Sequence, residues 1–217
     1  MNRKIQHIIF DFDGTLVDTG ALIVATIQSS IETLRLPART DAACRSVIGL
    51  RLEEVAAVLW PEIPGLSQPF ADCYRSTFEQ LKASIPVTCF PGVCETLQRL
   101  HETGYGLAIA SSRSHRSLAA YVEQFGMQDY FCMLIGGNDV EHGKPAPDPV
   151  LAILAAQQWS AEETLVVGDM AVDIRMGIAA DTRTCGVTYG NGSHDELTAA
   201  GATQIIDDFR SLLTVLE

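Results

Sequence analysis

The sequence predicts an α/β fold in which a parallel sheet carries an inserted, all-helical lobe. Short apolar runs recur along the chain, and from the second run onward helical segments separate them. Continuous apolar strands that alternate with helices are typical of a parallel sheet covered on both faces. The stretch from about Leu16 to Pro86 breaks this rhythm, because it contains several helical patterns and no convincing strand. Such a long insertion indicates a separate lobe.

Five apolar runs are expected to form the strands of the sheet. They cover residues 7–13, 106–112, 132–137, 164–169 and 184–190. The helices expected between and after them cover residues 92–103, 115–125, 148–157 and 172–181. In a parallel sheet of this kind the ligand lies beyond the carboxyl ends of the strands. Asp11, Ser111 and Asp169 all stand at such ends, so we expect the functional site there.

The inserted lobe is expected to begin and end at hinges near residues 16–19 and 85–91. Residues 18–36 carry apolar side chains at helical spacing, and Asp18 or Thr19 can cap the N-terminus of that helix. Two more helical patterns follow, at residues 51–60 and 70–83. The predicted organisation is a Rossmann-like α/β core formed by residues 1–16 and 86–217, with an all-helical lobe formed by residues 17–85.

Composition excludes several classes of function. The formal net charge of −12 repels phosphate backbones, so a nucleic-acid partner is disfavoured. The six cysteines form no C-x-x-C pair and stand in apolar segments, which is typical of buried thiols in a reducing cytosol. No apolar run approaches the roughly 20 residues of a membrane span. We therefore expect a cytoplasmic protein that binds neither nucleic acid nor membrane.

A cluster of carboxylates is expected at the strand ends. Asp11 and Asp13 lie side by side after the first strand, where they repel each other, and Gly14 permits a tight turn that holds both near one point. Asp169 follows a second apolar strand, with Asp173 four residues later. Each motif taken alone also fits a solvated turn or a helix cap. Together, oxygen ligands without histidine or cysteine suit a hard cation such as Mg²⁺, which would remove the repulsion.

Two further loops supply groups that can bind an anion. Lys144 follows Gly143 in a proline-rich loop, where it can keep a neighbouring carboxylate ionised and bind a phosphate oxygen. Ser111 and Ser112 end a strand, and their hydroxyl and backbone N–H groups can hold an anion. A single loop lysine is usually solvated, and a single serine often caps a helix. The ordered set of motifs is more specific than any of its members.

This ordered set resembles the haloacid dehalogenase-like superfamily. The position of the helical insertion, directly after the first motif, is similar to the C1-type cap of the phosphoglycolate phosphatase-like branch. The resemblance covers nearly the whole chain, and FPGVCETLQRL at residues 90–100 resembles the return into the core. The motifs that carry it are DFDGT at residues 11–15, Ser111 closing LAIASS, GKPAPDP at residues 143–149 and GDMAVD at residues 168–173.

The resemblance implies a phosphatase that works through an aspartyl phosphate. Asp11 would be the nucleophile and Asp13 the general acid and base, while Ser111 and Lys144 would hold the transferring phosphoryl group. The chemistry of these residue types agrees, because phosphoryl transfer depends chiefly on positioning and charge neutralisation. A carboxylate nucleophile divides hydrolysis into two easier steps.

The resemblance also implies a Mg²⁺ cofactor. Asp169 would bind the ion together with the Asp11 carboxylate and the Asp13 carbonyl group. Asp173 would act on the ion directly or through water. The same family contains enzymes with other activities, and three positions of this chain bear on them.

Asp13 argues against cleavage of carbon–halogen bonds and of phosphonates, because relatives with those activities lack an aspartate at that place. A β-phosphoglucomutase-like phosphomutase stays a weak alternative. Ile23 stands where such enzymes use a cap histidine, and Leu52 stands where they favour an arginine. Without those contacts the aspartyl phosphate is poorly shielded from water.

The substrate is expected to be a small phosphorylated metabolite. Phosphoglycolate leads by resemblance alone, while pyrophosphate, a sugar phosphate and a nucleoside monophosphate stay open. Gly49 and Arg51 in the cap turn are expected to face the site, where Arg51 can bind a substrate carboxylate or be a solvated residue at a helix start. Arg113, Thr15 and Ser112 complete the expected substrate-binding set. A catalytically idle binding module is the non-enzymatic alternative, and the sequence does not indicate an oligomeric state.

Overall fold

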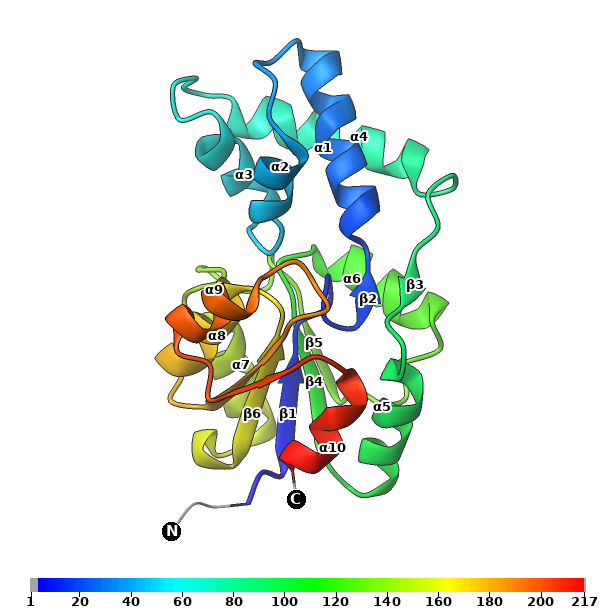
Figure 1. Cartoon of the computed structure of the whole chain (residues 1–217), viewed down its shortest axis with the longest axis vertical. Helices are drawn as coiled ribbons and strands as arrows, with labels where there is room; N and C mark the ends of the chain where they lie inside the picture. Colours follow the sequence, from blue (N-terminus) through cyan, green and yellow to red (C-terminus); the bar gives the residue numbers. More distant parts are fainter. Residues whose placement is uncertain (1–3, 217) are drawn as a thin grey trace.

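The computed structural model describes residues 4–216, which form an α/β core and, above it in Figure 1, a helical lobe. The core sheet has the strand order β5-β4-β1-β6-β7-β8, and every neighbouring pair is parallel. This confirms the predicted fold class. The strands are β1 (His7–Phe10), β4 (Gly106–Ala110), β5 (Met133–Ile135), β6 (Thr164–Gly168), β7 (Arg183–Val187) and β8 (Gln204–Ile206).

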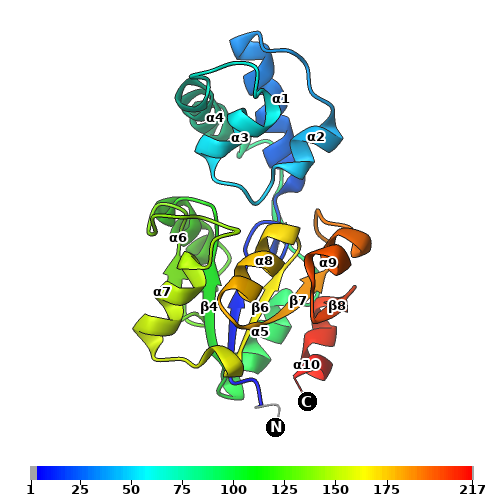
Figure 2. The same ribbon diagram turned by 90° about the vertical axis from the view of Figure 1, so that its left-hand side faces the viewer.

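Helices cover both faces of the sheet, which explains the continuous apolar strands. In β1, Ile8 and Phe10 belong to one hydrophobic cluster and Ile9 belongs to another on the opposite face. Helices α5 (Val93–Glu102), α6 (His115–Gln124) and α10 (Leu212–Val215) contribute to the first cluster. Helices α7 (Asp148–Gln157) and α8 (Ala171–Ala179) contribute to the second and lie in front of the sheet in Figure 2.

The end of the chain contains elements that the sequence did not predict. Strand β8 forms the edge of the sheet, and helices α9 (His194–Ala200) and α10 follow β7 and β8. Two short 3₁₀ turns, η1 (Ala161–Glu163) and η2 (Phe209–Ser211), complete the described core. These elements are short, so their hydrophobic periodicity is too brief to identify them.

The lobe consists of four helices around a hydrophobic cluster of its own. Trp60 and Phe70 are fully buried in it, with ring centroids 5.5 Å apart. Two lobe side chains, Leu22 and Phe78, instead belong to a cluster of the core. The predicted boundaries at residues 16/17 and 85/86 stay a prediction. The helices are α1 (Gly20–Leu34), α2 (Asp41–Ser46), α3 (Leu52–Leu59) and α4 (Ser67–Leu81).

Both connections between core and lobe pass through a small antiparallel ribbon. Strand β2 (Val17–Asp18) pairs with β3 (Thr88–Cys89). The expectation of no strand between residues 16 and 86 is therefore wrong for β2, whose two residues are too few to show an alternating pattern. Thr19 stands at the N-cap position of α1, but its hydroxyl makes no capping hydrogen bond. It donates instead to Asp13, at 2.7 Å.

Two expectations drawn from composition can be compared with the described residues. All six cysteines are free thiols there, but Cys94 and Cys132 are exposed, so the expectation of buried thiols is wrong for these two. Both stand beside apolar residues in sequence, which is why the sequence suggested burial. Within residues 4–216, no helix has the length and apolar character needed to cross a membrane.

Candidate active site

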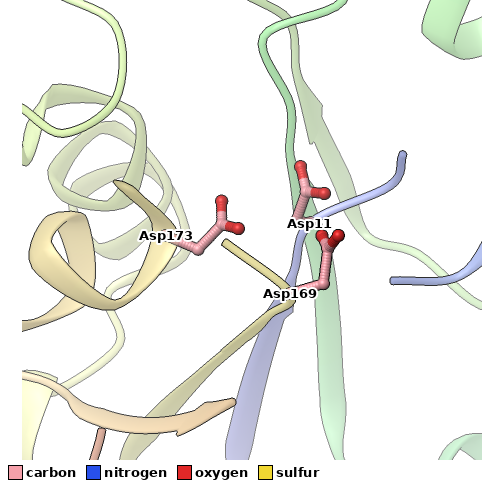
Figure 3. A group of neighbouring side chains, drawn as sticks. All are labelled: Asp11, Asp169 and Asp173. Carbon is pink, nitrogen blue, oxygen red and sulfur yellow. The ribbon is translucent and has the colours of Figure 1, made fainter. Parts of the chain in front are cut away.

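The candidate active site lies at the carboxyl ends of three neighbouring strands. Asp11 follows β1, Ser111 follows β4 and Asp169 follows β6. Asp173, on the first turns of α8, points toward Asp11 and Asp169 in Figure 3. Oxygen atoms of these three aspartates lie within 4.8 Å of one another, and all three residues are buried. The structure thus brings together carboxylates that lie up to 162 positions apart in the sequence.

Lys144 supplies the positive charge in this buried cluster. Its Nζ donates a hydrogen bond to Asp11 and another to Asp173, the latter at 2.7 Å. Burial lowers the pKa of Lys144, but the Asp11 and Asp173 carboxylates raise it by a larger amount, so it lies above its usual value. The ammonium group therefore stays charged and compensates part of the carboxylate charge.

Asp169 is held by groups from two other loops. Its Oδ2 accepts hydrogen bonds from the backbone N–H of Asn191 at 2.8 Å and from Asn191 Nδ2 at 2.9 Å. Thr15 Oγ1 donates to Asp169 Oδ1 at 3.1 Å. Burial and the Asp173 charge raise the pKa of Asp169 to about 7, although the hydrogen bonds from Asn191 and Thr15 lower it. Asn191 is not among the residues that the sequence predicts for the site, although its place directly after an expected strand was a usable signal.

The donor set fits a hard divalent cation. Asp11, Asp169 and Asp173 offer only oxygen atoms, and with Lys144 they carry a net charge of −2 when ionised. Burial raises the pKa of Asp11; the Lys144 ammonium lowers it, and the neighbouring carboxylates raise it again, so it lies well above its usual range. A cation among these oxygens would relieve both the burial cost and the mutual repulsion.

Asp13 stands apart from this cluster and has its own partners. Arg113 donates to it through Nε, at 3.1 Å to Oδ2, and through Nη2 to Oδ1. The guanidinium group lies over the ring of Tyr121, 4.7 Å from the centroid, and over Phe78 of α4 at 5.3 Å. Burial lowers the pKa of Arg113, but the charge of Asp13 raises it above its usual value. Arg113, predicted to bind substrate, is thus paired with the predicted general acid.

The turn between helices α2 and α3 of the lobe, which we call the cap turn because it belongs to the helical cap, reaches the core beside these residues. Ser112 Oγ donates to the carbonyl group of Gly49 at 2.6 Å. Arg51 donates through Nη1 to the Glu141 carbonyl at 2.6 Å and through Nη2 to the Val140 carbonyl at 2.7 Å. Four of the expected substrate-binding residues, Gly49, Arg51, Ser112 and Arg113, therefore line the cavity at the junction of lobe and core, with several of their donors engaged with protein groups. Thr15 does not; it is buried and donates to Asp169.

A cavity of about 1510 Å³ separates the lobe from the core. Asp11, Asp13 and Ser111 line its core side. Lobe residues line the other side, among them Ile23 and Gly49. A small phosphorylated molecule that enters this cavity meets Asp11 and Asp13 on one side and the lobe on the other.

Comparison with known proteins places the chain in a family. A family profile described as haloacid dehalogenase-like hydrolase matches residues 8–187. "Probable phosphatase IndB" of Dickeya dadantii is 34% identical over 95% of this chain and 91% of its own length. A phosphoglycolate phosphatase of Salmonella paratyphi A is 27% identical (99% and 93% covered), and pyrophosphatase PpaX of Anoxybacillus flavithermus is 29% identical (98% and 97% covered).

The fold comparison agrees with the sequence comparison. The structure of the haloacid dehalogenase-like family protein SP0104 from Streptococcus pneumoniae superimposes with a TM-score of 0.86, covering 98% of this chain and 99% of that one at 21% identity. At that identity the likeness shows a shared fold. Because the matching profile spans most of the sequence and a relative above 30% identity covers nearly all of it, the chain belongs to the haloacid dehalogenase-like hydrolase family.

Proposed function

We propose that the protein is a Mg²⁺-dependent phosphatase that hydrolyses a small phosphorylated metabolite through an aspartyl phosphate. The observation that carries this proposal is the buried Asp11 carboxylate, which accepts a hydrogen bond from Lys144 and faces the cavity under the lobe. The family membership and the phosphatase names of the relatives support it.

In the first step, a carboxylate oxygen of Asp11 attacks the phosphorus atom of the substrate. The new oxygen–phosphorus bond forms as the bond between phosphorus and the leaving oxygen breaks. Lys144 and Ser111 would hold the equatorial oxygens of the phosphoryl group. The Lys144 charge also opposes protonation of Asp11, which burial alone would favour.

Asp13 would transfer the protons of both steps. It gives a proton to the leaving oxygen in the first step and takes one from the attacking water in the second, which releases inorganic phosphate from Asp11. The two aspartates have different partners, so each can take a separate role. Asp11 pairs with Lys144, whereas Asp13 pairs with Thr19 and Arg113.

The carboxylates of Asp11, Asp169 and Asp173, with the carbonyl group of Asp13, would hold Mg²⁺. When bound, the ion neutralises negative charge on the transferring group. Thr15 and Asn191 orient the Asp169 carboxylate by hydrogen bonds, and such supporting partners commonly set the affinity of a metal site.

Phosphoglycolate is the favoured substrate, with pyrophosphate as the main alternative, because relatives of both names match nearly the whole chain. A phosphomutase is disfavoured, since Ile23, an apolar residue, lines the cavity where those enzymes use a histidine. A sugar phosphate or a nucleoside monophosphate are weaker candidates, and an idle binding module is weaker still. We further propose a cytoplasmic location with no nucleic-acid or membrane partner.

The test is phosphate release by Asp11→Asn beside Asp18→Asn as the matched control. Asp18 lies in the same stretch but is exposed on β2. We expect wild type and Asp18→Asn to hydrolyse p-nitrophenyl phosphate, phosphoglycolate or pyrophosphate only with Mg²⁺, and Asp11→Asn to lose activity by at least about 10³-fold. Activity that survives in Asp11→Asn would refute the mechanism, and an isomerised sugar phosphate without free phosphate would indicate a phosphomutase.

A further inference from the structure

We propose that Arg51 is a positioning residue that ties the helical cap to the loop carrying Lys144. This inference rests on the proposed function for its catalytic consequence, but the contact itself is independent of it. Arg51 is the N-cap residue of α3, directly after the cap turn. Its guanidinium group reaches the core and donates to two successive carbonyl groups, those of Val140 and Glu141. Lys144 follows three residues later.

The loop is shaped to receive this side chain. A Cβ atom at Gly143 would lie 2.4 Å from Arg51 Nε and 3.0 Å from Arg51 Cδ, so glycine is the residue that leaves room for the arginine. Arg51 Nε is buried there without a hydrogen-bond partner among the described residues. The side chain is thus held against the residue next to Lys144, although burying an unpaired N–H group is unfavourable.

Arg51 also borders two cavities. It lines the large cavity, as Asp11 does, and a second one of about 520 Å³, as Lys144 does. Replacing Arg51 by alanine would therefore open space for water next to the loop that carries Lys144, and water near the Lys144–Asp11 pair would weaken their interaction.

These contacts assign Arg51 a task other than recognition of a substrate carboxylate, which the sequence suggested. Both Nη groups are engaged with backbone carbonyls, and Nε faces Gly143. A guanidinium group fits this task because its fork bridges two acceptors at once, whereas a lysine ammonium would reach one of them. Replacing Arg51 should therefore slow phosphoryl transfer from every substrate, whatever its leaving group.

Kinetics of three variants test the proposal. We expect Arg51→Ala to lower kcat/KM on the order of 10- to 100-fold, because it should slightly displace a catalytic group. The factor should be the same for p-nitrophenyl phosphate and for phosphoglycolate. Arg51→Lys should retain intermediate activity. Arg99→Ala removes an exposed arginine that lines neither cavity, and it should leave activity unchanged. A loss confined to the carboxylate-bearing substrate would overturn the proposal.

Gly143→Ala provides a double-mutant cycle with Arg51→Ala. The new methyl group should displace the arginine, so Gly143→Ala alone should lose about as much activity as Arg51→Ala. The double variant should then lose no more than either single variant. Losses that multiply would show that Gly143 and Arg51 act independently, which would overturn the proposed coupling.

Hydrogen exchange gives a readout that does not depend on activity. The N–H group of Ala146 donates to the Gly143 carbonyl at 2.9 Å within this loop. Arg51→Ala should speed amide exchange in residues 138–148 and leave that of β1 unchanged. Unchanged exchange in the loop would overturn the inference. If wild type releases no phosphate from any compound, the proposed function fails while this experiment still decides whether Arg51 holds the loop.

Discussion

The carboxyl group of Asp169 combines complete burial with a pKa raised to about 7 by burial and by the Asp173 charge. Without metal, the native protein therefore holds a proton on Asp169 at pH values where the unfolded chain has lost it. The stabilisation from this proton is complete below about pH 4 and is lost as the pH rises through about 7. Mg²⁺ requires the ionised form, so its binding should strengthen over the same range.

Asp169→Asn removes this titration and tests the prediction. In urea unfolding with a chelator, the stability of wild type relative to Asp169→Asn should fall between about pH 5 and about pH 8. Adding Mg²⁺ at the higher pH should stabilise wild type more than the variant. A relative stability that rises with pH would contradict the prediction.

The ion pair of Arg113 and Asp13 is largely buried, with 9% and 13% of the side chains exposed. Arg113→Met keeps the contact with the aromatic rings but leaves Asp13 without its main partner. Breaking a buried pair in this way should lower the free energy of unfolding by about 3 kcal/mol. Urea unfolding of the variant measures this loss.

The double variant Asp13→Asn/Arg113→Met is the control for the pair. Since it leaves no unpaired charge, it should be more stable than Arg113→Met alone. If the double variant instead loses the sum of the two single losses, the two residues contribute independently to stability. In either case Asp13→Asn should remove most of the activity, because the proposed proton transfers depend on it.

At the scale of elements, the turn after β1 determines how the loops of the site approach one another. Gly14 has φ +93°, and a Cβ atom there would lie 2.2 Å from Asp169 Oδ2 and 2.4 Å from Asn191 Nδ2. We expect Gly14→Ala to weaken Mg²⁺ binding by about 10- to 100-fold, as measured by calorimetry, because it displaces a ligand and its supporting partner.

Gly104 offers a matched control for this substitution. It has φ +86° and no atom within 4 Å of its missing Cβ, so Gly104→Ala carries the same backbone strain without the steric clash. This variant should lose on the order of 1 kcal/mol of stability and keep its Mg²⁺ affinity. Equal loss of Mg²⁺ affinity in both variants would show that the clash at Gly14 is not the cause.

Most of the elements that the sequence predicted correctly have enough residues to show a pattern; β5, with three, lies in an apolar run that covers residues 132–135. Strands β1, β4 and β6 are apolar runs of four or five residues, and helix α7 has the predicted bounds. Strand β2 has two residues and β8 has three, so no period can be read from them. Both are formed by pairing with a distant partner strand.

At the scale of the whole molecule, cap and core have largely separate hydrophobic clusters. Phe70 packs against Trp60 in the cap, whereas Leu97 belongs to the core. We expect Phe70→Ala to cost about 3–5 kcal/mol locally and to speed hydrogen exchange in α1 and α4 more than in β1 and β6. Leu97→Ala should show the reverse pattern. Equal loosening of both regions by Phe70→Ala would show that they unfold as one cooperative unit.

The sequence by itself determined the parallel α/β core, the helical insertion and the strand ends at which Asp11, Ser111 and Asp169 stand. Local patterns carry that information, because apolar periodicity and turn residues act over a few neighbouring positions. The order of the motifs also indicated that Lys144 belongs with the carboxylates, and the structure brings them together. The roles of these residues in catalysis await the substitutions described above.

Only the tertiary structure decided which side chains support the site. Arg113 lies 100 positions from Asp13, Arg51 lies 89 from Val140, and Asn191 lies 22 from Asp169. A single sequence can place a residue such as Asn191 at a strand end, but it does not say which side chain that residue meets, since the contact depends on how loops and lobe pack over the finished sheet. Arg51 and Arg113, both predicted to bind substrate, bond to protein groups in the structure, because buried charges and carbonyl groups are stabilised by a partner. Their contacts with a substrate stay a prediction.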